Sequence, residues 1–97
     1  MNYIITPINH KVTLPKRGYF TLGDNSEDVG IIATFLATNF MGFEYKTGIK
    51  INNMLGSYFG LNLQGWIKEF QRICNIEIDG NIGKITLSKL RSYGLDC

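Results

Sequence analysis

The chain has 97 residues, of which 44% are hydrophobic and 19% are charged. A chain of this length supports one hydrophobic core, and the composition indicates an ordered domain and excludes a disordered tail. The formal net charge of +2 arises from ten basic and eight acidic side chains that are interspersed along the chain, so the sequence lacks the strong basic excess of nucleic-acid-binding domains.

The first 18 residues are expected to form an extended N-terminal arm or linker, and residues 19–97 the folded domain. Pro7 and Pro15 favour extended backbone in the arm. The closest approach to a basic patch is interpreted as solvated surface, and it consists of Lys11, Lys16 and Arg17. The first residues lack the charged-then-apolar order of a signal peptide, and no segment approaches the roughly 20 apolar residues that cross a bilayer.

The first helix is expected to begin at Asp24 to Ser26, where capping residues precede two acids whose charge suits a helix N-terminus. It should stop by Gly42. The apolar residues that recur at helical spacing are Val29, Ile31, Ile32, Phe35, Leu36 and Phe40. The glycine- and asparagine-rich connection that follows, residues 42–60, is expected to hold a small hairpin or an irregular loop.

The second helix is expected between Asn62, as its N-cap, and Cys74. Its buried face is predicted to consist of Leu63, Trp66, Ile67, Phe70, Ile73 and Cys74. Its solvated face is predicted to consist of Gln64, Lys68, Glu69, Gln71 and Arg72. Trp66 is therefore interpreted as core rather than as a sugar-stacking platform, and Phe59 and Phe70 are also assigned to the core.

The Asp79-Gly80-Asn81 segment predicts a turn with a positive φ angle, in which Asp79 caps its own backbone. The third helix should follow over residues 84–93 and end at Gly94. Its inward residues are predicted to be Ile85, Leu87 and Leu90.

One internal repeat is visible. Phe59-Gly60, followed by Leu63, Ile67 and Phe70, recurs 23 residues later as Ile82-Gly83, followed by Thr86, Leu90 and Tyr93. Each copy begins a helix with an apolar residue and a glycine, which predicts two similar turn-plus-helix units packed against the first helix.

Three segments carry a family resemblance. The first is Arg17-Gly18-Tyr19-Phe20, followed by Leu22-Gly23-Asp24 and by Asp28-Val29. The second is the helix segment 65–71, which ends in Phe70-Gln71, and the third is the segment 76–83 together with Thr86. In this order and spacing, over residues 17–94, the chain resembles the three-helix peptidoglycan-binding domain of bacterial cell-wall hydrolases and phage endolysins. The resemblance implies a mainly α fold, a small three-helix bundle of that type with an extended N-terminal arm. The sequence departs from the family pattern at Gly56–Gly60, which lacks the usual aspartate, and at Leu63, which replaces a threonine.

The residues do not predict an enzyme, a metal site or a cofactor. A zinc hydrolase needs three protein ligands, whereas the chain has one histidine, His10, with no carboxylate or cysteine at ligand spacing. A Cys/His hydrolase would need Cys74 or Cys97 beside that histidine, and Cys74 is assigned to the buried face. The acidic residues lie in no segment that suggests a deep cleft.

A peptidoglycan-binding surface needs exposed aromatics, amides and a few cations for sugar faces, stem peptides and carboxylates. The candidate ligand-binding residues are Tyr58, Asn62, Asp79, Asn81 and Lys84, expected around the two adjacent turns, with Tyr45 and Lys46 in the connection as a second location. Asp79 is interpreted first as a turn cap, and a capped turn can also fix the rim of a pocket.

The resemblance implies a non-catalytic module that targets a linked or associated lytic enzyme to the bacterial cell wall, with peptidoglycan or another wall polymer as its partner. The charge balance and the lack of a long apolar segment predict no nucleic-acid or membrane partner. The resemblance implies a location outside the membrane and an origin compatible with a phage gene. The alternative is a protein-interaction module or accessory subunit of a larger lysin with the same fold.

Overall fold

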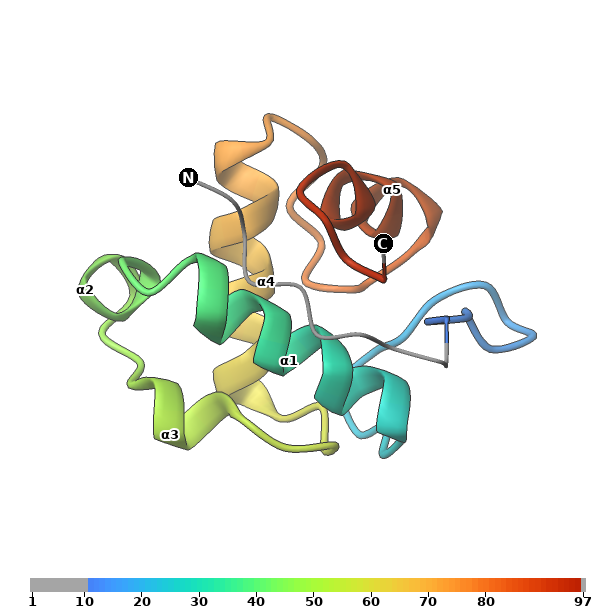
Figure 1. Ribbon diagram of the computed structural model, residues 1–97, viewed down its shortest axis with the longest axis horizontal. Helices are drawn as coiled ribbons and strands as arrows, with labels where there is room; N and C mark the ends of the chain where they lie inside the picture. The colour runs from blue at the N-terminus through green and yellow to red at the C-terminus, as the bar shows by residue number, and fades with distance from the viewer. Residues whose placement is uncertain (1–10, 97) are drawn as a thin grey trace.

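The structure, a computed structural model, describes residues 11–96. The interpretations of His10, of the first ten residues of the arm and of Cys97 lie outside the described residues. Within residues 11–96 the chain is mainly helical and contains two isolated β-bridges but no strand. The helices are α1 (Glu27–Asn39), α2 (Phe43–Thr47), α3 (Ile51–Met54), α4 (Leu61–Ile73) and α5 (Lys84–Ser92) (Figure 1).

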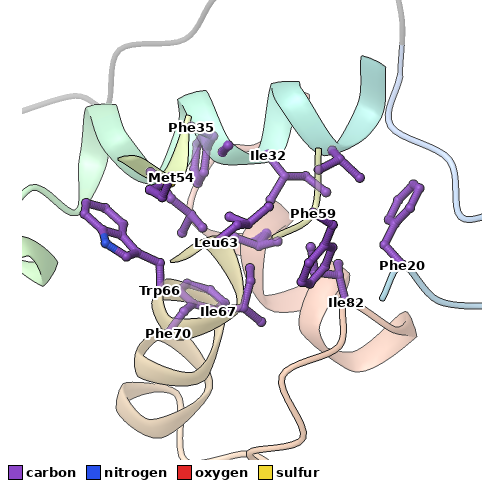
Figure 2. Close-up of a cluster of buried hydrophobic side chains, with 14 of the residues drawn as sticks. Phe20, Ile32, Phe35, Met54, Phe59, Leu63, Trp66, Ile67, Phe70 and Ile82 are labelled. Atoms are coloured by element: carbon purple, nitrogen blue, oxygen red, sulfur yellow. The ribbon is translucent and has the colours of Figure 1, made fainter. Parts of the chain in front are cut away.

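The core lies between α1, α4 and α5. Ile32 and Phe35 of α1 point toward Leu63 and Ile67 of α4 (Figure 2). The largest fully buried side chains include Trp66, Phe59 and Phe70, as the sequence predicted. The three expected helices therefore form one bundle around a shared core, since their apolar faces have one another to bury against.

Helix α1 begins where its capping residues predict. The Ser26 Oγ accepts a hydrogen bond from the Val29 N–H at 3.2 Å, and Glu27 and Asp28 occupy the first turn. The helix ends at Asn39, before Gly42. The Ser26 hydroxyl satisfies one of the unpaired N–H groups at the start of the helix, and the two acidic side chains complement the positive end of the helix dipole.

The start of α4 differs from the prediction. Gly60, not Asn62, is the N-cap, and Asn62 lies inside the first turn, where its Nδ2 donates to the Asn53 carbonyl at 2.9 Å. The reason is a long-range constraint: the Phe59 backbone is paired with Gly23 and Asp24, at 2.8 and 2.7 Å. This pairing holds the chain extended up to residue 60, so the helix begins directly after it.

The predicted faces of α4 need two corrections. Ile73, expected in the core, is 42% exposed because it is the last helical residue and the chain then turns at Asn75, whose φ is 57°. Gln71, expected on the solvated face, is 1% exposed. A buried amide is stable only when its polar atoms are hydrogen-bonded, and those of Gln71 are bonded to the turn before α5.

The connection forms two short helices, so the expectation of a hairpin or an irregular loop was wrong. Phe43 in α2 and Met54 in α3 are both buried and fasten these helices to the core. Gly48 ends α2 with a φ of 73°, a left-handed conformation that glycine adopts without strain. The Glu44 carboxylate then accepts from the Ile51 N–H at 2.8 Å and joins α2 to α3.

Helix α5 matches the prediction at Leu87 and Leu90, which are buried, but not at Ile85, which is 66% exposed. Gly83 is the N-cap, and from that start positions 86, 87 and 90 face the core. Thr86 takes the inward place because its hydroxyl accepts from the Gln71 Nε2 at 3.1 Å.

The segment before α1 pairs with the residues that immediately precede α4 and α5. Phe20 and Ile82 exchange backbone hydrogen bonds at 2.9 Å in both directions, and Gly23 donates to the Phe59 carbonyl. Gly60 and Gly83 are both N-caps with extended backbone, at φ −101° and −96°. The structure thus confirms two similar turn-plus-helix units, and it adds the extended segment that lies against both.

Residues 11–14, in the predicted arm, pack against the end of the chain. Val12 is fully buried, and its N–H donates to the Asp96 carboxylate at 3.1 Å. The Arg91 guanidinium donates to the Val12 carbonyl at 2.6 Å and to Asp96. This clamp fixes the arm beside α5.

Candidate functional site

A groove of about 590 Å³ opens at the N-terminal end of α4. Its lining residues are Leu22, Asn53, Met54, Leu55, Tyr58, Gly60, Leu61, Asn62 and Leu63. The first of these belongs to the extended segment and the rest to α3, the following turn and the first turn of α4. The groove therefore depends on chain segments that are distant in sequence.

Backbone pairing positions the aromatic ring of the groove. The backbone of Tyr58 forms an isolated bridge with that of Asn25, and the neighbouring Ser57 hydroxyl donates to the Asn25 side chain at 2.8 Å. A Cβ at Gly60 would lie 3.2 Å from Tyr58 Cε2. Glycine at this position leaves the ring room beside the backbone, while 58% of Tyr58 remains exposed.

The chemistry of the groove is apolar with amide groups at its edge. Leu22, Leu55, Tyr58 and Leu61 are large hydrophobic residues that remain exposed. Asn62 uses its Nδ2 on the Asn53 carbonyl, and no side-chain hydrogen bond of Asn53 is present among residues 11–96. None of the lining residues is charged. This combination suits an uncharged ligand with flat apolar faces and amide or hydroxyl groups.

Two of the predicted site residues belong to the turn before α5, where their polar atoms serve the fold. The Asp79 Oδ1 accepts from the Asn81 N–H and from the Gln71 Nε2, both at 2.9 Å, while Gly80 has a φ of 76°. The Thr21 hydroxyl donates to the Asn81 Oδ1 at 2.7 Å. Asp79 thus caps the turn, as interpreted from the sequence.

Lys84 lies in a second cleft, of about 300 Å³, whose lining shares no residue with the groove. The lining residues of this cleft are Lys11, Val12, Thr13, Leu14, Lys84, Leu87 and Arg91. Tyr45 and Lys46 are exposed on α2 and line neither the groove nor the cleft. Of the seven predicted residues, the structure brings only Tyr58 and Asn62 into one groove.

Sequence reasoning missed Gln71 and the exposed leucines of the groove. Leu55 and Leu61 flank the turn on either side of Tyr58, and neither belongs to the apolar face predicted for the second helix. Two leucines outside that face and close to a predicted ligand aromatic were an available signal. Gln71 is the last residue of the helix segment that carries the family resemblance. A glutamine within a motif, directly after a core phenylalanine, was a signal for a structural role.

The structure shows the surroundings of Cys74, the described candidate for a nucleophile, and the arrangement of the side chains that could bind a metal. Cys74 packs against the core, and burial raises the pKa of its thiol despite the opposing charge of Lys89. A raised pKa leaves the thiol protonated at neutral pH, which makes it a weak nucleophile. Across residues 11–96 no three His, Cys, Asp or Glu side chains cluster as metal ligands would, and no helix there is long and apolar enough to span a bilayer.

Comparisons with protein-family models, with curated proteins and with solved structures found no match for this chain. The resemblance to peptidoglycan-binding domains therefore stands on the motif residues themselves.

Proposed function

We propose that this chain is a peptidoglycan-binding module and that its groove binds the glycan of the bacterial cell wall. The motif order from Arg17 to Gly94 supports the choice of polymer. The observation that carries the proposal is the groove itself, because it places an exposed tyrosine among exposed leucines and asparagine amides without a charged residue.

The groove suits an amino-sugar strand in two respects. The apolar face of a sugar ring packs on an aromatic side chain, so Tyr58 is the stacking surface and Leu61 extends it. The N-acetyl groups and hydroxyls of the strand need hydrogen-bond partners, which the Asn53 and Asn62 side chains provide. Trp66 takes no part, because it is fully buried and its Nε1 donates to the Ile49 carbonyl at 2.9 Å.

A binding module of this kind acts by holding a linked or associated catalytic unit at its substrate. When the module binds the polymer, the effective concentration of the catalytic unit at the polymer rises, and the module itself needs no chemical activity. The proposed partner is therefore a wall-lytic enzyme, and the proposed place of action is the cell wall.

The test is sedimentation with purified peptidoglycan from which teichoic acids and proteins have been removed. Tyr58→Ala should weaken binding about tenfold, the effect of losing roughly 1.4 kcal/mol from an aromatic contact. Tyr45→Ala removes a tyrosine that is 92% exposed on α2, outside the groove, and should bind as the parent does.

Each variant should first be shown to be folded by its thermal midpoint. Equal binding by Tyr58→Ala, Leu61→Ser and the parent would remove the groove from the proposal, and loss of binding by Tyr45→Ala would move the site to α2. A parent chain that does not sediment with walls from several bacteria would contradict the proposed function as a whole.

A further inference from the structure

We infer that the cleft between the arm and α5 is a second subsite, which binds the free carboxylate of a peptide. Resting on the proposed function, this peptide is the stem peptide of the same wall polymer. The groove has no charged lining residue, whereas the cleft has three cationic ones and no acidic one. The two surfaces are thus suited to different parts of one ligand.

The fold places two lysines that are far apart in the sequence in the lining of one cleft. Lys11 is held at the cleft because the neighbouring Val12 is buried, and because Thr13 donates from its N–H to the Asp28 carboxylate at 3.1 Å. Lys84 is the first residue of α5. Both lysines are exposed, and neither forms an ion pair with residues 11–96. Neither charge is therefore held in an ion pair within this part of the chain.

The third cation of the cleft has a different role. Arg91 is committed to the Val12 carbonyl and to Asp96, where its Nε lies 3.3 Å from the carboxylate. Its charge is largely neutralised by that pair, and its contacts hold the arm in place. Lys11 and Lys84 are the groups left to attract an anion.

The floor of the cleft selects the kind of anion. Leu14 is half-buried and supplies aliphatic surface in the cleft, while Val12 and Leu87, both buried, form its apolar floor. A bare phosphate gains nothing from such a surface, whereas a carboxylate beside a short aliphatic side chain gains both burial and charge-assisted contacts. A peptide that ends in alanine has this chemistry.

The experiment is a nuclear magnetic resonance titration of the ¹⁵N-labelled chain with diacetyl-L-lysyl-D-alanyl-D-alanine. The amide signals of Val12, Thr13 and Leu87 should shift, and the C-terminal amide of the same peptide should bind about tenfold more weakly, since it lacks the charge. Binding should also weaken as salt is raised from low to physiological concentration. Glycerol 3-phosphate is the competing anion and should bind more weakly than the peptide.

The variant Lys11→Gln/Lys84→Gln should weaken peptide binding about tenfold. Lys89→Gln is the control variant. Lys89 lies on the same helix as Lys84 but outside the cleft, and its substitution also removes a positive charge, so this variant should bind the peptide as the parent does. Arg91 is left unchanged because its loss would release the arm.

Equal affinities for the acid and the amide, tighter binding of the phosphate, or shifts confined to other residues would each overturn the subsite. These outcomes are separable from failure of the proposed function. A chain that sediments with walls through Tyr58 but ignores the tripeptide keeps the function and loses the subsite. A chain that binds the tripeptide at the lysines but does not sediment with walls keeps a carboxylate site and loses the wall polymer as its ligand.

Discussion

The side-chain carbonyl of Gln71 accepts a hydrogen bond from the backbone N–H of Gly80 at 3.0 Å, inside the protein. Its amide nitrogen lies 2.9 Å from the Asn81 carbonyl and 3.1 Å from the Thr86 hydroxyl. One N–H donor and several acceptors surround this side chain, so its amide has one satisfactory orientation. Gln71 therefore connects α4 to the turn that leads into α5.

Replacing Gln71 by leucine should lower the free energy of unfolding by about 2 to 3 kcal/mol, because buried backbone groups would lose their partner. Urea denaturation measures this. Gln64→Leu is the matched control, since Gln64 lies on the same helix and has no side-chain hydrogen bond among residues 11–96; it should change stability by less than about 0.5 kcal/mol. Similar values for both variants would contradict a structural role for the Gln71 amide.

Phe70→Ala should destabilise the protein by about 3 to 5 kcal/mol, the usual cost of emptying a core aromatic site. The Phe70 ring is fully buried, with the Phe40 ring at 5.4 Å and the Tyr93 ring at 5.9 Å between centroids. Chemical denaturation followed by the emission of the single tryptophan reports the loss. A change below about 1 kcal/mol would be incompatible with this packing.

Gly80→Ala should destabilise by about 1 to 2 kcal/mol, because its φ of 76° strains an alanine. The added Cβ would also lie 2.9 Å from Lys68 Cε. Gly42→Ala makes the same chemical change at a φ of −61°, with no neighbouring atom within 4 Å. That variant should be neutral or more stable by up to about 1 kcal/mol, since alanine restricts the unfolded chain. Thermal melts of the two variants should shift in opposite directions or differ clearly in size.

Acid should weaken the protein partly through Asp24. Partial burial acts to raise the pKa of this carboxyl, but the hydrogen bonds from Arg17 and from the Thr21 N–H, with the charge of Arg17, outweigh it. The pKa therefore lies below its ordinary value of 3.8. A carboxyl with a depressed pKa in the folded state stabilises the fold above its unfolded pKa, and this contribution is lost as the pH falls through the folded pKa.

The corresponding measurement compares urea denaturation of the parent and Asp24→Asn between pH 7 and pH 2. The variant should be less stable than the parent at pH 7, and the difference should shrink as the pH falls below about 4. A difference that stays constant over this range would show that the charge of Asp24 does not contribute.

Local pattern predicted those parts of the fold that depend on local physics. Ser26 caps α1 because its hydroxyl accepts a hydrogen bond from the Val29 N–H, three residues along the chain. Trp66 is buried because it lies in an apolar stripe of helical period. The N-cap of α4 and the burial of Gln71 were predicted wrongly, since both depend on partners elsewhere in the chain: the pairing of Phe59 with the extended segment, and the turn at Gly80. No periodicity within a helix contains such information.

The same distinction applies to the candidate site. Tyr58 was identifiable as an exposed aromatic in a glycine turn, but its neighbour in the groove, Leu22, approaches only after the extended segment has paired with the turn. Lys11 was interpreted as ordinary solvated surface, because the sequence does not show that Lys11 and Lys84 line one cleft; that arrangement depends on the burial of Val12 beside α5. Residues in one local segment were predictable, and surfaces assembled from two distant segments were not.

The backbone exchange between Phe20 and Ile82 also bears on when this protein can fold as it is made. Synthesis proceeds from the N-terminus, so the extended segment leaves the ribosome long before its second partner exists. Closing so long a loop is slow compared with forming a helix. The pairing of the extended segment consequently cannot be completed until residue 82 has been translated, and a chain stalled before that residue would expose the apolar faces of α1 and α4 to chaperones and proteases.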